Sequence, residues 1–169
     1  ATNFKVKVTI DDAVANVRVR YLRPSGAPLE KRYDVAAGQR SNIWANLETF
    51  DGALLLAASD VSASLEVLNG VPIIAERAMY LTTPTPGAVV FEAGHESAGV
   101  TAPSPSWFFA EGATGDAFDL FVLLANPGDT AATVRGTYLL PDGTTYTKNY
   151  SVPASARVNI WVDLETFDG

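Results

Sequence analysis

The chain has 169 residues, of which 47% are hydrophobic and 18% are charged, and its formal net charge is −7. This composition supports a packed core rather than a disordered linker, and acidity without a Lys/Arg cluster argues against nucleic acid or an anionic membrane as a partner. No apolar run reaches the roughly 20 residues that span a bilayer, and the chain has no cysteine for disulfides or thiolate chemistry.

The first half of the chain alternates apolar and polar residues with a period of two. This alternation, each time followed by a turn signal, is found in residues 4–12, 17–26 and 61–70. The first of these turn signals is Asp11-Asp12 and the last is Asn69-Gly70, a strong hairpin dipeptide. Residues 71–81 continue as a longer, mostly apolar strand. Short alternating strands separated by turns predict an all-β fold, as in a β-sandwich or barrel.

Residues 82–106 have a different composition, with four prolines and several Thr and Ser. Such a segment is typical of a connector between domains. The sequence therefore predicts a first β-sandwich unit at residues 1–83, a connector at residues 84–106, and a second, partial unit at residues 107–169.

The most informative feature of the chain is an internal repeat. Residues 17–52 align without a gap to residues 134–169 at an offset of 117, and 20 of the 36 aligned positions are identical. We expect matched residues to occupy the same core positions: Tyr21, Ile43 and Leu47 in the first copy, and Tyr138, Ile160 and Leu164 in the second. Self-similarity of this kind marks stacked copies of one unit, which favours a structural or adhesive array over an enzyme with one unique cleft.

The same offset can be extended towards the beginning of each copy. It aligns Phe4 with Phe121, Lys5 with Val122, Val6 with Leu123, and Lys7 with Leu124. Phe121 and Leu123 are then expected to face inward, and Val122 and Leu124 place hydrocarbon where the first copy has charge. Two interpretations remain open: Val122 and Leu124 contact a neighbouring unit, or they lie on a central strand that is covered within its own domain.

Several short motifs occur in an order that resembles a known group of proteins. They are EGATG at 111–115, LLANPG at 123–128, YLLPDG at 138–143, VPA at 152–154 with Arg157, PIIAERAMY at 72–80, and GHES and GVTAP within 94–103. They resemble tandem β-domains of large secreted or surface-anchored bacterial proteins, and the resemblance covers most of the chain. It implies an immunoglobulin-like or fibronectin-like sandwich and extracellular placement, and it carries no catalytic residues. The first copy departs from the pattern, because KVKVTIDD replaces LLANPGD.

Catalytic and metal-binding constellations are weak in this sequence. His95, the only histidine, occupies the position two residues before Ser97 at which a nucleophile elbow needs glycine. The acidic loops at 11–12, 48–52, 126–129 and 165–169 lack EF-hand spacing, and Ca²⁺ needs about six or more converging oxygens. We therefore expect no enzymatic activity and no cofactor, and calcium stays an alternative.

Two tryptophans at matched positions are the clearest surface candidates. Trp44 is flanked by Asn42 and Asn46 on the same strand face, and Trp161 is flanked by Asn159 and Asp163. A tryptophan beside amide and carboxylate groups can stack on a sugar ring, but its large amphipathic ring equally suits packing on a neighbouring strand.

Together these observations predict a non-enzymatic structural or adhesive repeat of an extracellular bacterial surface protein or fibre. Its expected partners are neighbouring repeats or identical chains, joined by strand complementation, without membrane insertion. The alternative to complementation between chains is that a longer parent chain fills both strand gaps in cis. The alternative is a carbohydrate-binding module that uses Trp44 and Trp161.

Overall fold

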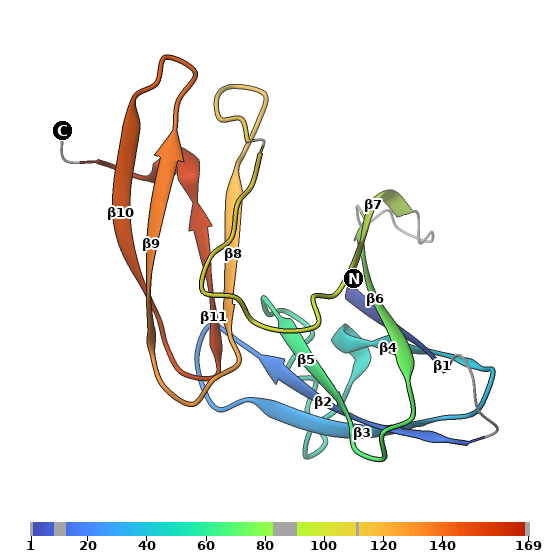
Figure 1. The fold of residues 1–169 in the computed structure, drawn as a ribbon. Helices are drawn as coiled ribbons and strands as arrows, with labels where there is room; N and C mark the ends of the chain where they lie inside the picture. The colour runs from blue at the N-terminus through green and yellow to red at the C-terminus, as the bar shows by residue number, and fades with distance from the viewer. Residues whose placement is uncertain (1, 9–12, 83–90, 111, 168–169) are drawn as a thin grey trace. The chain divides into compact units, whose positions relative to one another are not determined.

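The structure is a computed structural model that describes residues 2–8, 13–82, 91–110 and 112–167 (Figure 1). These residues form strands and two short 3₁₀ helices, and the described part of the chain contains no α-helix. The all-β prediction is therefore confirmed. The turn predicted at Asp11-Asp12 and residues 84–90 of the predicted connector lie outside the described residues.

The first part of the chain contributes two sheets. Its elements are β1 (Thr2–Val8), β2 (Ala15–Leu22), β3 (Leu29–Val35), β4 (Arg40–Trp44), η1 (Ala45–Leu47), β5 (Ser62–Val67), β6 (Ile73–Thr82) and β7 (Phe91–Ala98). One sheet has the strand order β4-β1-β6-β7 and the other has the order β3-β2-β5. In the four-stranded sheet β1 is antiparallel to both of its neighbours, β4 and β6.

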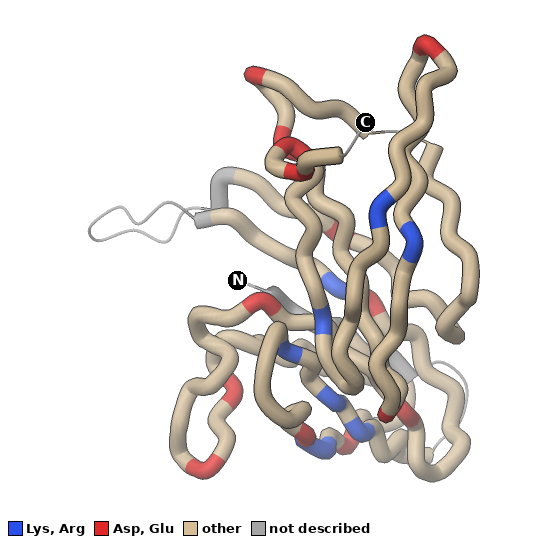
Figure 2. The backbone as a smooth tube through the Cα atoms, turned by 90° about the vertical axis from the view of Figure 1, so that its left-hand side faces the viewer, with Lys and Arg blue, Asp and Glu red and all other residues tan. Residues whose placement is uncertain are grey.

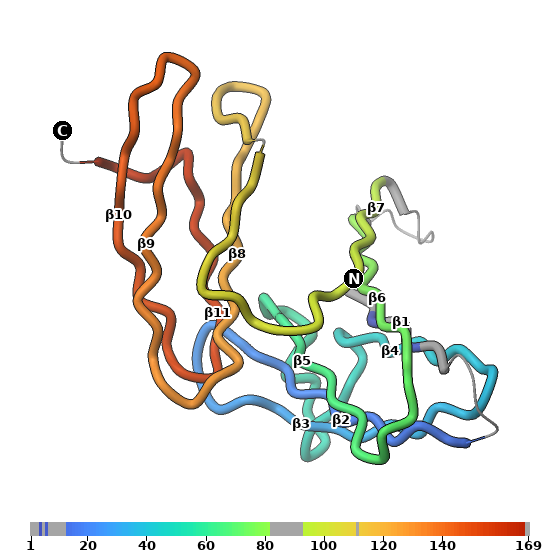
Figure 3. The backbone as a smooth tube through the Cα atoms, viewed as in Figure 1, coloured from blue at the N-terminus to red at the C-terminus, as the bar shows by residue number. Residues whose placement is uncertain are grey.

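The second part of the chain contributes two smaller sheets. Its elements are β8 (Phe121–Asn126), β9 (Ala132–Leu139), β10 (Thr145–Val152), β11 (Ala156–Trp161) and η2 (Val162–Leu164). β9 and β10 form an antiparallel hairpin, which Figure 3 shows as two long adjacent runs of the tube. β8 pairs with β11 in the other sheet, also antiparallel.

The chain divides into two compact units. Unit 1 comprises Ala1–Arg20 and Leu29–Ser104, and unit 2 comprises Tyr21–Pro28 and Pro105–Gly169. The structure differs from the predicted connector, because β7 lies within residues 84–106 and pairs with β6 in unit 1. Backbone hydrogen bonds build this strand, and they leave no pattern in the side chains.

Unit 1 has a continuous buried core that draws on both of its sheets. The buried side chains are Phe4, Val6, Ala15, Val17, Val19, Val35, Ile43, Ala45, Leu56 and Ala78. Along β2, buried residues alternate with half-buried ones, which is the period of two read from the sequence. Removing each Val, Leu, Ile or Phe side chain of this set from water contributes about 1.5–3 kcal/mol, so this core is the main source of stability in unit 1.

Unit 2 buries fewer residues. The buried residues there are Tyr21, Leu22, Val152, Ala156 and Ile160, together with Arg157. The backbone N–H of Arg157 donates to the carbonyl of Arg23, at 3.2 Å, in the Tyr21–Pro28 segment of the same unit.

Elements at matched positions of the internal repeat recur in the structure. β4 and η1 correspond to β11 and η2, and the β2–β3 and β9–β10 turns both contain a glycine with positive φ, at Gly26 (83°) and Gly143 (86°). An ion pair between a strand lysine and the glutamate that follows the 3₁₀ helix recurs as well. Lys31 bonds to Glu48 in the first copy, and Lys148 bonds to Glu165 at 2.6 Å in the second.

The strand ahead of each copy follows a different offset. Ile43 on β4 pairs with Phe4, but Ile160 on β11 pairs with Val122, so the strands β1 and β8 are related by 118 residues and not by 117. A slip of one residue exchanges the two faces of a strand.

The predicted orientation of β8 is therefore wrong by one residue. Val122 and Leu124 are half-buried, whereas Phe121 and Leu123 are 47% and 54% exposed. The prediction failed because β8 is hydrophobic at five consecutive positions, so alternation of apolar and polar residues does not show there which side chains face inward.

The predicted core pairs hold in part. Ile43 and Ile160 are both buried, but Leu47 and Leu164 are 62% and 67% exposed at the ends of η1 and η2. The strand alternation stops where each 3₁₀ helix begins, so the period of two no longer predicts which side chains face inward. Tyr21 is fully buried and Tyr138 is half-buried.

Charged side chains follow the strands. Figure 2 shows most basic residues along strands and several acidic residues at loop ends. Arg18 pairs with Glu66, and Arg20 with Glu30 at 2.8 Å, across neighbouring strands of the three-stranded sheet. Such exposed pairs contribute little to stability, typically about 0–1 kcal/mol each.

Candidate functional site

Trp161 stands at the end of β11 and is held by two contacts within unit 2. Its ring stacks on Phe121 with ring centroids 5.3 Å apart, and its indole Nε1–H donates to Asp119 at 3.1 Å. The side chain is still 40% exposed. The stacking partner comes from the neighbouring strand β8, so one edge and one face of this tryptophan are already engaged.

The polar residues around Trp161 are also engaged. Asp163 Oδ2 accepts a hydrogen bond from the backbone N–H of Leu120 at 2.8 Å, and its Oδ1 accepts from that of Gly115 at 3.3 Å. Asn159 Oδ1 accepts from the guanidinium of Arg157. These groups fasten the segment ahead of β8 to β11 and η2, and they leave few free oxygens to bind a sugar.

Trp44, at the matched position of unit 1, has a different environment. It is 38% exposed, and its indole N–H has no partner within the described residues. Asn42 accepts from Arg40 Nε at 3.3 Å, and Asn46 Oδ1 is buried without a hydrogen-bond partner in the described part of the chain.

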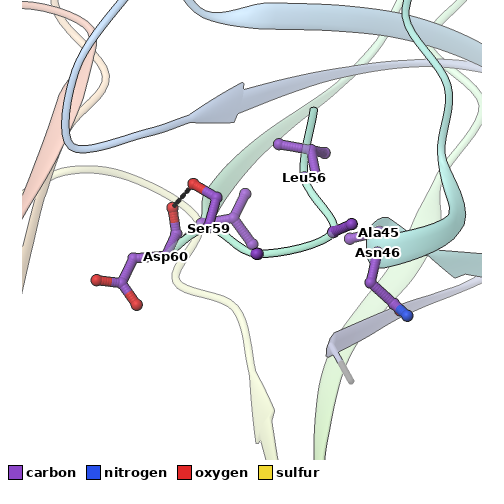
Figure 4. A pocket seen from close by; sticks show the side chains of 8 residues that line it. Ala45, Asn46, Leu56, Ser59 and Asp60 are labelled. Carbon is purple, nitrogen blue, oxygen red and sulfur yellow. Dashed lines mark hydrogen bonds between the residues drawn. The ribbon is translucent and has the colours of Figure 1, made fainter. Parts of the chain in front are cut away.

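A hollow of about 430 Å³ lies beside Asn46. It is lined by Ala45, Asn46, Leu56 and residues 57–61. Figure 4 shows Leu56 on one side of the hollow, with Ser59 and Asp60 on the other. The Ser59 hydroxyl donates to the Asp60 carbonyl at 3.0 Å. This lining combines small side chains with Asn46, Leu56 and Val61, and it contains a single carboxylate, that of Asp60.

A polar cluster supports β10 and η2 from within unit 2. Tyr150 bonds to Tyr138, at 2.8 Å between their hydroxyl oxygens, and its hydroxyl donates to Glu165 at 3.1 Å. Burial, followed by these hydrogen bonds, raises the pKa of Tyr150. The hydrogen bond from Lys148 lowers the pKa of Glu165, with a smaller contribution from Tyr150. These contacts hold the residues that follow η2 against the β9–β10 hairpin.

His95 lies on β7, where its Nδ1 is 3.2 Å from Nη2 of Arg77. The same guanidinium donates to Ser97 Oγ, also at 3.2 Å. The described contacts therefore join His95 and Ser97 each to Arg77 and not to one another. This geometry gives no base for a serine nucleophile.

The interface residues predicted on β8 need correction. Val122 and Leu124 lie on the half-buried face, so the exposed apolar side chains of this strand are Phe121 and Leu123. Sequence reasoning also missed residues 115–120 as the partner of Asp163. The signal available was the difference between Asn46 and Asp163 within an otherwise repeated NIW…LETFDG stretch.

Within the described residues, no helix is long and apolar enough to cross a membrane. The same part of the chain holds no group of three or more His, Cys, Asp or Glu side chains placed to bind a metal ion. No family model, curated protein or solved structure matches the chain.

Proposed function

We propose that this chain is a non-enzymatic structural or adhesive repeat of an extracellular bacterial surface protein or fibre, built from immunoglobulin-like or fibronectin-like sandwiches. The repeated sequence and the recurring strands, turns and ion pair support an array. The resemblance of its motifs to tandem β-domains supports extracellular placement. Neighbouring units then join by strand addition.

One observation carries the strand-addition part of the proposal. β1 lies between β4 and β6, and β2 lies between β3 and β5. Their counterparts β8 and β9 are each paired on one side only within the described residues, with β11 and β10. A strand with unpaired N–H and C=O groups along one edge is a ready template for another strand.

Two apolar side chains of β8 are exposed to solvent, which favours association with another strand. Phe121 and Leu123 are about half exposed on one face of this strand. Apolar side chains beside an open strand edge mark an interaction surface. An added strand would pair with the backbone of β8 and cover Leu123.

The test is sedimentation equilibrium of the 169-residue chain over a wide concentration range. We expect reversible self-association that Leu123→Lys weakens strongly, because a charge on an edge strand opposes strand pairing. The matched control is Ala154→Lys, which places the same charge in the exposed turn between β10 and β11 and should leave association unchanged. A strictly monomeric chain at all concentrations, with β8 and β9 ordered in its NMR spectrum, contradicts strand addition.

The carbohydrate-binding alternative now rests on Trp44 alone, because Trp161 and Asp163 are engaged within unit 2. Trp44 is 38% exposed, and its indole N–H has no hydrogen-bond partner within the described residues. Glycan binding that is lost in Trp44→Ala and kept in Trp161→Ala would favour this alternative.

A further inference from the structure

Residues 68–72 connect the two sheets of unit 1. β5 belongs to the three-stranded sheet and β6 to the four-stranded sheet, so the two strands do not pair with each other. The hairpin expected at Asn69-Gly70 is therefore wrong. The dipeptide does form a turn, with φ 73° at Gly70, but the strand that follows it pairs with β1 and β7.

The side-chain amide of Asn69 takes the place of a peptide group beside the start of β2. Its Nδ2 donates to the Val14 carbonyl at 2.7 Å, and its Oδ1 accepts from the backbone N–H of Asn16 at 3.1 Å. The backbone N–H of Leu68 donates to the Asn16 carbonyl at 2.8 Å. These bonds extend the pairing of β5 with β2 beyond the end of β5 at Val67. The two side-chain bonds are called the Asn69 clamp below.

The residue after Asn69 leaves its own backbone nitrogen open to reaction. Asn69 is the only asparagine of the sequence that is followed by glycine. Nothing lies within 4 Å of the position that a Cβ of Gly70 would take, and within the described residues the Gly70 N–H has no hydrogen-bond partner. Both residues are exposed, so water reaches them. The Gly70 nitrogen is therefore an unshielded nucleophile next to the side-chain carbonyl of Asn69.

We propose that Asn69 is a deamidation site that the clamp protects while it is closed. When the clamp opens, the backbone nitrogen of Gly70 attacks Cγ of Asn69 and closes a succinimide ring. The Cγ–Nδ2 bond breaks, and Nδ2 leaves as ammonia with the proton of the Gly70 nitrogen. Water then opens the ring at either of its carbonyl carbons, which gives aspartate or isoaspartate.

The clamp slows the first step because that step expels the atom that donates to Val14. Ring closure cannot be completed while Nδ2 keeps this bond, so the reaction proceeds from a locally open state. Two net hydrogen bonds of ordinary strength reduce the population of that state by about 5–100-fold. Deamidation of the folded chain should be slower than that of an unstructured peptide by the same factor.

The product cannot form the clamp again. Aspartate has acceptor oxygens and no amide donor, so a charged oxygen would stand against the Val14 carbonyl where Nδ2 stood. Isoaspartate also adds one carbon to the backbone between β5 and β6. Deamidation therefore removes this contact irreversibly, and the chain keeps a covalent record of past opening at the start of β2. The proposal does not depend on strand addition at β8 or β9, so either can fail without the other.

The test is incubation of the full chain at neutral pH, with peptide mapping by mass spectrometry to follow the conversion of each asparagine. The reference is the peptide EVLNGVPI, which has the sequence of residues 66–73. We expect Asn69 to convert about 5–100-fold more slowly in the folded chain than in this peptide. Urea should raise the rate towards that of the peptide, in step with the opening of the Asn16 amide measured by hydrogen exchange.

A variant that carries the aspartate product gives the second arm. In Asn69→Asp, exchange of the Asn16 amide should be about 3–10-fold faster, the loss of one net hydrogen bond. Asn149→Asp is the matched control, because it makes the same substitution at an exposed position of β10 in unit 2, and it should leave Asn16 exchange unchanged. Dispersed spectra establish that each variant is folded.

Three results would overturn the proposal. Conversion of Asn69 as fast in the folded chain as in the peptide would show that the clamp does not protect it. No conversion at Asn69 after urea has opened the Asn16 amide would show that the clamp is not what controls the reaction. Unchanged Asn16 exchange in Asn69→Asp would show that the product still holds the start of β2.

Discussion

Alanine at the two matched positions, 46 and 163, should change stability in opposite directions. In Asp163→Ala, the backbone N–H groups of Leu120 and Gly115 lose a charged acceptor at 2.8 and 3.3 Å. A hydrogen bond to a charged group contributes about 1.5–3 kcal/mol when well formed. One short and one long bond at a half-buried carboxylate therefore give a destabilisation of about 2–4 kcal/mol.

Asn46→Ala removes an acceptor that has no partner within the described residues. The unfavourable burial of that oxygen disappears with it, so unit 1 of the isolated chain should be unchanged or more stable by up to about 2 kcal/mol. Asp163→Asn keeps the acceptor and loses the charge, and it should fall between the wild type and Asp163→Ala.

The assay is residue-resolved amide hydrogen exchange at low urea, which reports the opening free energy of each unit separately. The Leu120 amide should lose about 30-fold or more of its protection in Asp163→Ala, the counterpart of about 2 kcal/mol. If Asn46→Ala destabilises unit 1 as much as Asp163→Ala destabilises unit 2, then Asn46 Oδ1 is already satisfied in solution.

Three further predictions concern unit 2. Leu124→Ala should lower the free energy of urea unfolding by about 1–3 kcal/mol, but Leu123→Ala, on the exposed face, should lower it by less than about 0.5 kcal/mol. If Leu123→Ala is the more destabilising of the two, β8 follows the offset of 117 after all. Lys148 lowers the pKa of Glu165 below its unfolded value of about 4.3. The stability that this pair contributes should therefore be complete above about pH 5 and should be lost as the pH falls through the lowered pKa. If the free energy of unfolding of a Glu165→Gln variant falls as steeply at acid pH as that of the wild type, the assignment is refuted. Gly143→Ala should destabilise the chain by about 1 kcal/mol, since φ is 86° there and an L side chain is disfavoured in that region; an unchanged unfolding midpoint would show that the turn relaxes.

Much of the strand content could be predicted from the sequence. The alternation along β2 and the glycines of the turns specify local geometry directly, because side chains point to alternate faces and a positive φ favours glycine. The matched positions of Ile43 and Ile160 followed from the repeat alone. All of these features follow either from residues close together in the sequence or from comparison of the two copies.

The features that could not be predicted depend on partners far apart in the chain. The register of β8 is set by its hydrogen bonds to β11, and five consecutive hydrophobic residues gave no reason to choose one face. β7 pairs with β6 through its backbone, so its polar sequence resembled a connector. The role of residues 115–120 emerged only when Asp163 was seen to accept their N–H groups.

The position of β1 between β4 and β6 has a mechanical consequence. A stretching force applied along β1 must shear hydrogen bonds on both of its sides, with five residue pairs facing β4 and seven facing β6. Within the described residues, β8 has one partner strand, β11, with six residue pairs, so it resists the same load through one interface where β1 has two. Forced unfolding is governed by the height of the barrier to rupture, so under tension unit 2 yields before unit 1 until another strand covers its open edge.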